Sequence, residues 1–509
     1  MKNSPYSSRY RIPLILFSSL VTLYFSIACS GSDDASPTTG TSSQKVVGRL
    51  LVASEVASSV AVIDLEQSAL ESSMKSYSSS SILVASPEGN FAFVVQSAGN
   101  RIDVLEMGES VSITSESTET AEVDDHGHDH GKPRFSGEDE SDSTTTSTTS
   151  VSTVALSLTG ENPGFIISKG EWISFQFQDK VYVVSEEGLE NNLNSITQTL
   201  LHEKTSIFPG IPLDSEHIAL GANVFEIEED TQLHTSTNAT ALSLTSDNIL
   251  SATRPAEGVA LYGTDQGLLL VCEHTESGNV EWEDFFVPYP SILEENIFLA
   301  SGHEHEEGEA EEEGEDEHEE VMENAAAKDW ATHDGLGHAF AHLTHEDHSA
   351  GVYLVEANTL EEDGVVDAWE FLAGTSNVSY RPLALAIAKM PEEEHDEEEE
   401  HVDEYLLLIL TSEGHLRVHD AVDEGSLITI LENVIPAVTD FHEGEGNLPG
   451  LTAGLGKAYV GDPSTNQIHQ IDLSSYAVEL TWVGELSPNE LLFLGESSHA
   501  EGAEGHDHD

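Results

Sequence analysis

The chain has 509 residues and an extreme charge: 94 acidic residues stand against 18 lysines and arginines, a formal net charge of −76 at pH 7. Binding of phosphate groups requires a basic surface, so this balance excludes nucleic acid as a partner. Cations, in contrast, would be attracted to such a surface. An acidic surface that keeps the protein solvated accounts for part of the charge. It does not explain why so many acids stand beside histidines.

The N-terminus has the layout of a secretory signal peptide, with basic residues followed by an apolar run at residues 12–27. The run ends at Ala28 and Cys29, a sequence that resembles a bacterial lipobox, in which the cysteine becomes the lipidated first residue. We therefore predict a lipoprotein signal peptide at residues 1–28, with a plain signal peptide as the alternative. Ser30 after the cysteine favours the outer membrane, so we expect a protein of the cell envelope that is lipid-anchored and contacts the membrane only through this anchor.

A flexible tether is predicted next, at residues 29–45, because this stretch is rich in Ser, Thr, Gly and Asp. The only other cysteine is Cys272. If Cys29 carries lipid, the fold contains no internal disulfide, although an exported protein could form one. No later segment is apolar enough to span a bilayer.

Most of the remaining chain has an all-β pattern, in which short apolar runs alternate with Gly, Asn, Asp and Ser turns. Three hairpin-like segments align without gaps, at residues 49–65, 92–105 and 457–473. The repeat length is about forty residues, which is typical of a β-propeller. The first and last segments match best, as a ring that closes on itself requires. We predict an all-β fold, a β-propeller of seven or eight blades over residues 46–497, with paired β-sandwiches or a solenoid as alternatives.

Charged insertions interrupt this pattern at about residues 107–150, 302–348 and 391–403, and a His/Asp-rich tail follows at residues 498–509. Most of these stretches cannot bury enough apolar surface to fold alone. We therefore predict that they form disordered loops and a disordered tail outside the ring.

Histidines cluster with acidic residues in these stretches, most densely in the Asp-Asp-His-Gly-His-Asp-His-Gly motif at residues 124–131. Neutral imidazole is a good ligand for zinc, copper and nickel, and zinc takes about four ligands from His, Cys or carboxylate. We therefore predict zinc, in preference to copper or nickel. The candidate ligands in these clusters are Asp124, His126, His128, Asp129, His130, His303, His305, His506 and His508.

A further group, His338, His342, His345 and His348, stands among apolar and aromatic residues. His338, His342 and His345 would share one face of a helix. Residues 335–342 and 351–356 could equally be two strands of one blade. The group is a candidate for a pre-formed metal site, and ordinary buried or loop histidines are the alternative.

The chain resembles the periplasmic zinc metallochaperones of the AztD type. The resemblance covers most of the predicted mature chain and rests on the segments at residues 49–65, 124–131, 159–163, 258–271 and 457–473. It implies a β-propeller that passes zinc to the solute-binding protein of a zinc ABC importer, and it assigns zinc binding to the loop at residues 124–131.

The sequence also departs from this family at positions that matter for the metal. Gly164 and Ser168 follow Pro163 where the family tends to carry histidine, and none is present near Pro209. Cys272 would be one half of a family disulfide, but its partner is missing. The high-affinity site and the transfer step therefore do not follow from the resemblance.

The leading functional hypothesis is capture, storage or delivery of zinc at the envelope by a monomeric protein that is not an enzyme. The alternative is an acidic β-propeller scaffold or adhesin on the cell surface, without a specific role for metal. A metalloenzyme is disfavoured because the sequence has no Gly-x-Ser-x-Gly motif and because catalysis needs rigidly held groups.

Overall fold

The structure is a computed structural model. It describes residues 48–495 with the exception of residues 58, 66–68, 75–81, 108–153, 192–196, 201–208, 221–222, 228–232, 236–248, 277–278, 291, 293–296, 298–324, 334–335, 346–347, 357–368, 392–403, 424 and 442–446. The predicted signal peptide, tether and C-terminal tail therefore lie outside the described residues.

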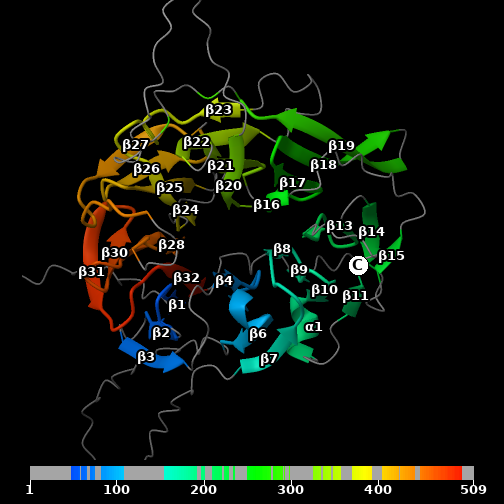
Figure 1. Ribbon diagram of the computed structural model, residues 1–509, viewed down its shortest axis with the longest axis horizontal. Helices are drawn as coiled ribbons and strands as arrows, with labels where there is room; N and C mark the ends of the chain where they lie inside the picture. Colours follow the sequence, from blue (N-terminus) through cyan, green and yellow to red (C-terminus); the bar gives the residue numbers. More distant parts are fainter. Residues whose placement is uncertain are drawn as a thin grey trace, which may run out of the picture. The chain divides into compact units, whose positions relative to one another are not determined.

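The described residues form eight four-stranded antiparallel sheets, arranged as the blades of a propeller (Figure 1). Blades 1 to 4, each from its innermost to its outermost strand, consist of β32 (Glu490–Gly495), β1 (Gly48–Ala53), β2 (Val60–Asp64) and β3 (Ala69–Met74); β4 (Ile82–Ala85), β5 (Phe91–Gln96), β6 (Arg101–Glu106) and β7 (Val154–Thr159); β8 (Ile166–Lys169), β9 (Trp172–Gln176), β10 (Lys180–Ser185) and β11 (Thr197–Leu200); and β12 (Ile211–Pro212), β13 (His217–Leu220), β14 (Asn223–Ile227) and β15 (Leu233–Thr235).

Blades 5 to 8 follow in the same order and complete the ring. They consist of β16 (Ile249–Ala256), β17 (Val259–Thr264), β18 (Gly267–Glu276) and β19 (Asn279–Pro288); β20 (Ala325–Thr332), β21 (His338–His345), β22 (His348–Glu356) and β23 (Trp369–Phe371); β24 (Pro382–Lys389), β25 (Tyr405–Thr411), β26 (Leu416–Asp420) and β27 (Leu427–Leu431); and β28 (Leu451–Gly454), β29 (Lys457–Asp462), β30 (Gln467–Asp472) and β31 (Ala477–Val483). The described helices are the short α1 (Glu186–Asn191) and the 3-10 turn η1 (Ser97–Gly99). No described helix is long and apolar enough to cross a bilayer.

The ring closes because the last strand of the chain is the innermost strand of the first blade. β32 pairs antiparallel with β1, from Gly495 opposite Gly48 to Glu490 opposite Ala53. The Asn489 side chain reinforces the join, because its Oδ1 accepts the backbone N–H of Glu55 at 3.1 Å. The predicted propeller and its closure are confirmed, and the structure sets the number of blades at eight.

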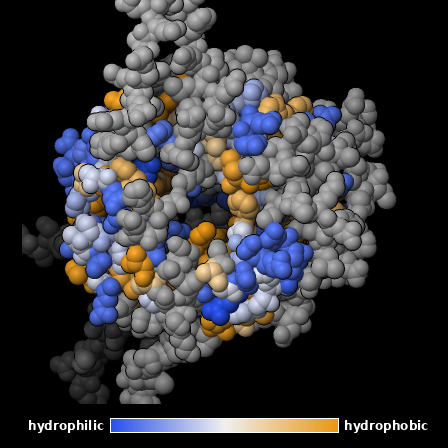
Figure 2. All heavy atoms as spheres, in the orientation of Figure 1, coloured by the Kyte–Doolittle hydropathy of each residue, from blue (hydrophilic) through white to orange (hydrophobic). Residues whose placement is uncertain are grey.

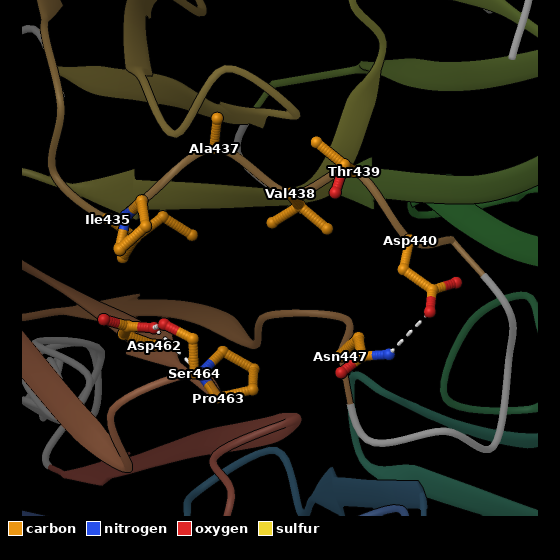
Figure 3. A pocket seen from close by; sticks show the side chains of 10 residues that line it. Ile435, Ala437, Val438, Thr439, Asp440, Asn447, Asp462, Pro463 and Ser464 are labelled. Carbon is orange, nitrogen blue, oxygen red and sulfur yellow. Dashed lines mark hydrogen bonds between the residues drawn. The ribbon is translucent and has the colours of Figure 1, made fainter. Parts of the chain in front are cut away.

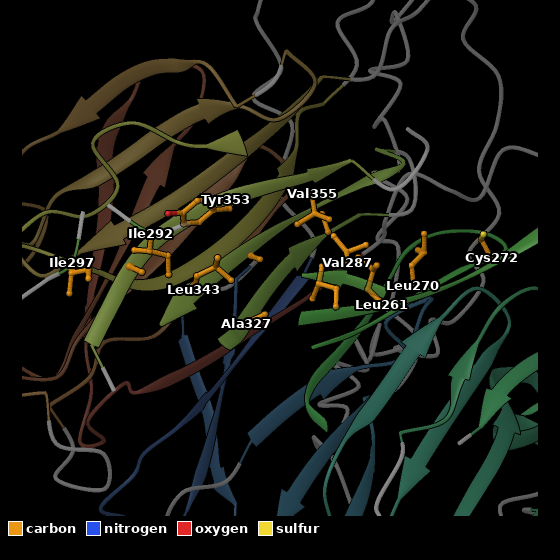
Figure 4. Packing of buried hydrophobic residues seen from close by; sticks show 14 residues of the cluster. Leu261, Leu270, Cys272, Val287, Ile292, Ile297, Ala327, Leu343, Tyr353 and Val355 are labelled. Carbon is orange, nitrogen blue, oxygen red and sulfur yellow. The ribbon is translucent and has the colours of Figure 1, made fainter. Parts of the chain in front are cut away.

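Burial follows the position of a strand within its blade. Every residue of β25 is buried, because this strand is covered on both faces by neighbouring blades, and this requires a continuous apolar run. The outer strand β27 of the same blade is mostly exposed. Between blades 5 and 6, Leu261, Leu270 and Tyr353 pack in one apolar cluster, which also contains the buried Cys272 (Figure 4). The core therefore lies in the seams between blades.

Strand direction divides the ring into two faces. We name the face that carries Gly48 and Gly495 the terminal face. Gly89, in the turn between β4 and β5, lies against Gly495 on this face. Because strands alternate in direction, each first-to-second and third-to-fourth strand connection of a blade lies there too. The connections at residues 108–153 and 392–403 therefore start and end at the terminal face, and the connection at residues 298–324 does so at the opposite face.

The insertion predicted at residues 302–348 is shorter in the structure. The stretch at residues 302–348 was expected as a loop, but residues 325–345 form β20 and β21, and β22 begins at His348. The reason is that Ala327, Phe340 and Leu343 are fully buried, so the charged residues of this stretch alternate with residues of the blade core. The helical interpretation of the histidines is wrong, and their placement on two strands of one blade is confirmed.

Candidate functional site

The four candidate histidines of blade 6 do not meet at one point. β21 runs from His338 at the terminal face to His345 at the opposite face, a rise of roughly 20 Å or more over eight residues. His345 pairs with His348 across the turn between β21 and β22. The structure therefore brings His345 and His348 together as backbone partners and separates both from His338.

His338 joins two blades. Its Nε2–H donates to the carbonyl oxygen of Ala421 on blade 7 at 2.7 Å, and its ring packs edge-on against Phe340. Burial lowers the pKa of His338, because desolvation penalises the charged imidazolium. The imidazole is therefore neutral at pH 7, and one ring nitrogen is used to connect the blades.

His342 lies in the interior of blade 6 between two polar side chains. Its Nε2 hydrogen-bonds with Ser349 Oγ at 2.8 Å, and its Nδ1 lies 3.5 Å from an oxygen of Asp329, its cross-strand partner on β20. A Ser-His-Asp order is also found in hydrolases, but Ser349 is 0% exposed. A substrate cannot reach this hydroxyl, so the arrangement does not present a nucleophile.

The other predicted ligands lie outside the described residues. They are Asp124, His126, His128, Asp129, His130, His303, His305, His506 and His508, together with the predicted lipidation site Cys29. Their flanking strands are described, however, and these place the ends of the segment with His126, His128 and His130 at the terminal face. Among the described residues, no group of three or more His, Cys, Asp or Glu side chains is placed to hold a metal ion.

Sequence reasoning missed a carboxylate–histidine pair on blade 4. Both carboxylate oxygens of Asp214 lie within 3.0 Å of His217 Nδ1, in the connection between β12 and β13 at the terminal face. The hydrogen bond to this carboxylate raises the pKa of His217, and the same contact lowers the pKa of Asp214 against the opposing effect of burial. The Asp-x-x-His spacing was the available signal, but it is common in turns.

The centre of the ring carries acidic side chains. Figure 2 shows an opening at the middle of the molecule, and Glu490 and Asp329 belong to the innermost strands β32 and β20. Burial raises the pKa of Glu490 to about 7, with the charges of Asp329 and Glu55 acting in the same direction and a hydrogen bond from the Leu83 backbone opposing it. Glu490 therefore changes its charge near neutral pH.

A cavity of about 240 Å³ opens at the opposite face between blades 7 and 8 (Figure 3). The Asp440 carboxylate accepts a hydrogen bond from Asn447 Nδ2 at 3.2 Å across it, while Asp462 is occupied by the turn that it caps, through Ser464 and Thr465. The lining residues are Ile435, Pro436, Ala437, Val438, Thr439, Asp440, Asn447, Asp462, Pro463 and Ser464. These residues include no imidazole or thiol, so the cavity lacks the ligands that zinc prefers.

Known proteins resemble the chain in fold but not in sequence. No protein-family profile and no curated protein sequence matches the chain. Two solved structures of AztD from Citrobacter koseri, one of them the apo form, match with TM-scores of 0.56 and 0.55 at 14% identity. Each match covers 89% of this chain and 99% of AztD.

The chain shares its fold with AztD. The resemblance expected from the sequence is therefore confirmed at the level of the eight-bladed propeller, over nearly the whole of the AztD chain. The dihydro-heme d1 dehydrogenase NirN also matches, with a TM-score of 0.44 and 10% identity over 88% of this chain and 75% of that one. A likeness of that size carries no functional argument.

Proposed function

We propose that the protein binds zinc at the cell envelope and captures, stores or delivers it, and that its acceptor is the solute-binding protein of a zinc ABC importer. The observation that carries the proposal is the shared fold with AztD over 99% of that chain, combined with the histidine-rich segments of this sequence. The resemblance to zinc metallochaperones of the AztD type supplies the acceptor.

The topology supports a common place of action for three of these segments. The segment with His126, His128 and His130 joins β6 to β7, and the segment with His395 and His401 joins β24 to β25. Both connections start and end at the terminal face, and the tail with His506 and His508 also leaves from it after β32. One face of the ring is therefore the starting point of three groups of potential zinc ligands.

The described blades provide no group of three ligands, so the proposal assigns zinc binding to these segments. Imidazoles and carboxylates from such segments suit zinc, and ordering of the segment opposes binding through its entropy. We expect zinc to bind reversibly and with moderate affinity, as a donor to a second protein requires. Protons compete for the same imidazoles, so affinity falls as the pH falls.

The test is calorimetric titration of zinc into the chain produced without residues 1–29, at neutral pH. The variant replaces His126, His128 and His130 by alanine, and the matched control replaces Thr144, Thr145 and Thr146 of the same segment. We expect the histidine variant to lose the tightest binding and the threonine control to retain it. Binding no tighter than about millimolar by the parent, about −4 kcal/mol, would overturn the proposal.

Delivery is tested separately by mixing the zinc-loaded protein with the solute-binding protein of the zinc importer from the same organism. Direct transfer predicts a rate that rises with acceptor concentration and exceeds spontaneous release. A rate equal to spontaneous release at every acceptor concentration would leave storage without delivery.

The envelope location rests on the predicted lipoprotein signal. We propose that Cys29 carries the lipid and that the protein is held to the outer membrane. Replacement of Cys29 by serine should release the protein from the membrane fraction and abolish incorporation of a labelled fatty acid. Retention of both properties by the variant would contradict the anchor.

One observation favours an interaction scaffold as a second function. The outer strands of blades 7 and 8 expose apolar side chains to solvent: Leu427 is 47% exposed and Val483 is 74% exposed. Apolar side chains exposed on an outer strand are available for contact with a partner protein. If the protein is a scaffold, the alanine variant at His126, His128 and His130 keeps its cellular function, whereas zinc handling predicts loss of growth under zinc limitation.

A further inference from the structure

The Asp214–His217 pair on blade 4 has a geometry that its role in the turn does not require. Asp214 Oδ1 accepts the backbone N–H groups of Glu216 and His217, both at 2.6 Å, and this alone caps the turn. The same carboxylate also holds His217 Nδ1, at 2.9 Å and 3.0 Å from its two oxygens. The carboxylate only accepts, so Nδ1 carries a hydrogen, and in the neutral imidazole Nε2 carries the lone pair.

The Nε2 atom of His217 has no role in hydrogen bonding among the described residues, and the side chain remains 22% exposed. The indole of Trp282, on β19 of the neighbouring blade, packs against the imidazole with ring centroids 5.3 Å apart. The carboxylate and the indole therefore fix the orientation of a ring that remains partly exposed to solvent.

A second potential ligand lies on the neighbouring strand. Glu226 on β14 is the direct cross-strand partner of His217, and such pairs place their Cβ atoms about 5 Å apart on the same face of a sheet. The Glu226 side chain is exposed, and its charge acts on His217 together with those of Asp214 and Glu216. His234 on β15 holds the next register position in this row, opposite Glu226.

We propose that this row on blade 4 binds a divalent first-row transition-metal ion of the zinc class, with His217 Nε2 and a Glu226 carboxylate oxygen as ligands and Asp214 as the positioning residue. A carboxylate on the far nitrogen of a ligand imidazole fixes its tautomer and raises its basicity, as is usual for metal-bound histidines. Mixed imidazole and carboxylate ligation suits zinc, copper or nickel rather than calcium.

This site is distinct from the histidine-rich segments. It is built on strands of the ring and lies at the terminal face, from which three of those segments also start. The proposal therefore does not depend on the zinc relay, because its residues lie on described strands of blade 4.

Trp282 provides a local reporter for the test, because Cu²⁺ bound at His217 quenches a neighbouring indole. We would titrate Cu²⁺ into the chain produced without residues 1–29, follow tryptophan emission, and then add Zn²⁺ in competition. We expect a saturable quenching component that Zn²⁺ reverses and that is absent from Trp282→Phe and from His217→Ala. The control His469→Ala, a histidine on blade 8, should leave the component unchanged.

Two further variants keep the test informative if His217→Ala disturbs the turn. Glu226→Gln, on the exposed side, should weaken Cu²⁺ binding at least tenfold. Asp214→Asn can still cap the turn, so it should weaken binding about 10-fold to 100-fold and shift the pH midpoint of binding downward, because the carboxylate that raises the pKa of His217 is gone. A merely structural Asp214 would not move that midpoint.

The outcomes separate this site from the proposed function. Replacement of His126, His128 and His130 by alanine should lower the number of zinc ions bound but leave the Trp282 response intact. An unchanged Trp282 response in both His217→Ala and Glu226→Gln, with the fold preserved, would overturn the blade 4 site and leave the segments untouched.

Discussion

Replacement of Glu490 by glutamine should stabilise the ring at alkaline pH but not at acidic pH. Glu490 begins β32, the strand that closes the propeller, and burial raises the pKa of its carboxyl from 4.5 to about 7. The folded protein therefore holds the proton more tightly than the unfolded chain does. Stability from the protonated group is fully present below about pH 4.5 and is lost as the pH rises through 7.

The shift from 4.5 to about 7, at 1.36 kcal/mol per pKa unit, sets the loss at no more than about 3 kcal/mol, and solvent near this partly buried side chain reduces it. The assay is urea unfolding followed by tryptophan fluorescence at pH 5 and pH 8. Glu490→Gln should exceed the parent by up to about 3 kcal/mol at pH 8 and by much less at pH 5. Glu432→Gln, which removes an exposed carboxyl, serves as the matched control for the loss of one acidic group.

Because the protein carries so many acids, its stability changes with pH for many reasons at once. Only the difference between variant and parent isolates Glu490. An equal difference at both pH values would refute the reasoning, because it would mean that the carboxyl titrates alike in the folded and unfolded states.

Three further predictions concern stability. Tyr262 and Tyr459 are both fully buried, but only the Tyr262 hydroxyl donates to backbone carbonyls, at 3.3 Å, and the Tyr459 hydroxyl has no partner among the described residues. Thermal unfolding should therefore show that Tyr262→Phe loses about 1 kcal/mol of stability, whereas Tyr459→Phe is unchanged or stabilised. Lys457→Met removes an ion pair that lowers the pKa of Asp472, so it should cost about 1–3 kcal/mol at neutral pH. A urea series should show this cost shrinking below about pH 4, because the unfolded chain of the parent then takes up a proton that the folded protein excludes from Asp472. A chain that ends at the close of β32 should melt like the parent, whereas one that lacks β32 should lose its cooperative transition in calorimetry, because the first blade then has no innermost strand.

The sequence alone was sufficient for the propeller, because blade strands carry a local pattern. Runs such as those of β1 and β29 pair apolar residues with polar turns at a regular spacing, and this pattern depends only on neighbouring residues. The number of blades was harder to predict, since some strands are very short, such as the two residues of β12. The strand β20 was hidden because Lys328 and Asp329 interrupt its apolar residues, so that no period-two pattern is visible.

For the candidate sites, too, local sequence patterns were predictable and long-range contacts were not. The sequence by itself determined which segments carry potential zinc ligands, because the clustering of His126, His128 and His130 is a local property. Only the tertiary structure decided that His338 hydrogen-bonds with the backbone of Ala421, 83 residues away, and that Trp282 of another blade orients His217. Such contacts depend on which blades are neighbours around the ring, and that order is fixed by packing over the whole chain, beyond the range of any local pattern.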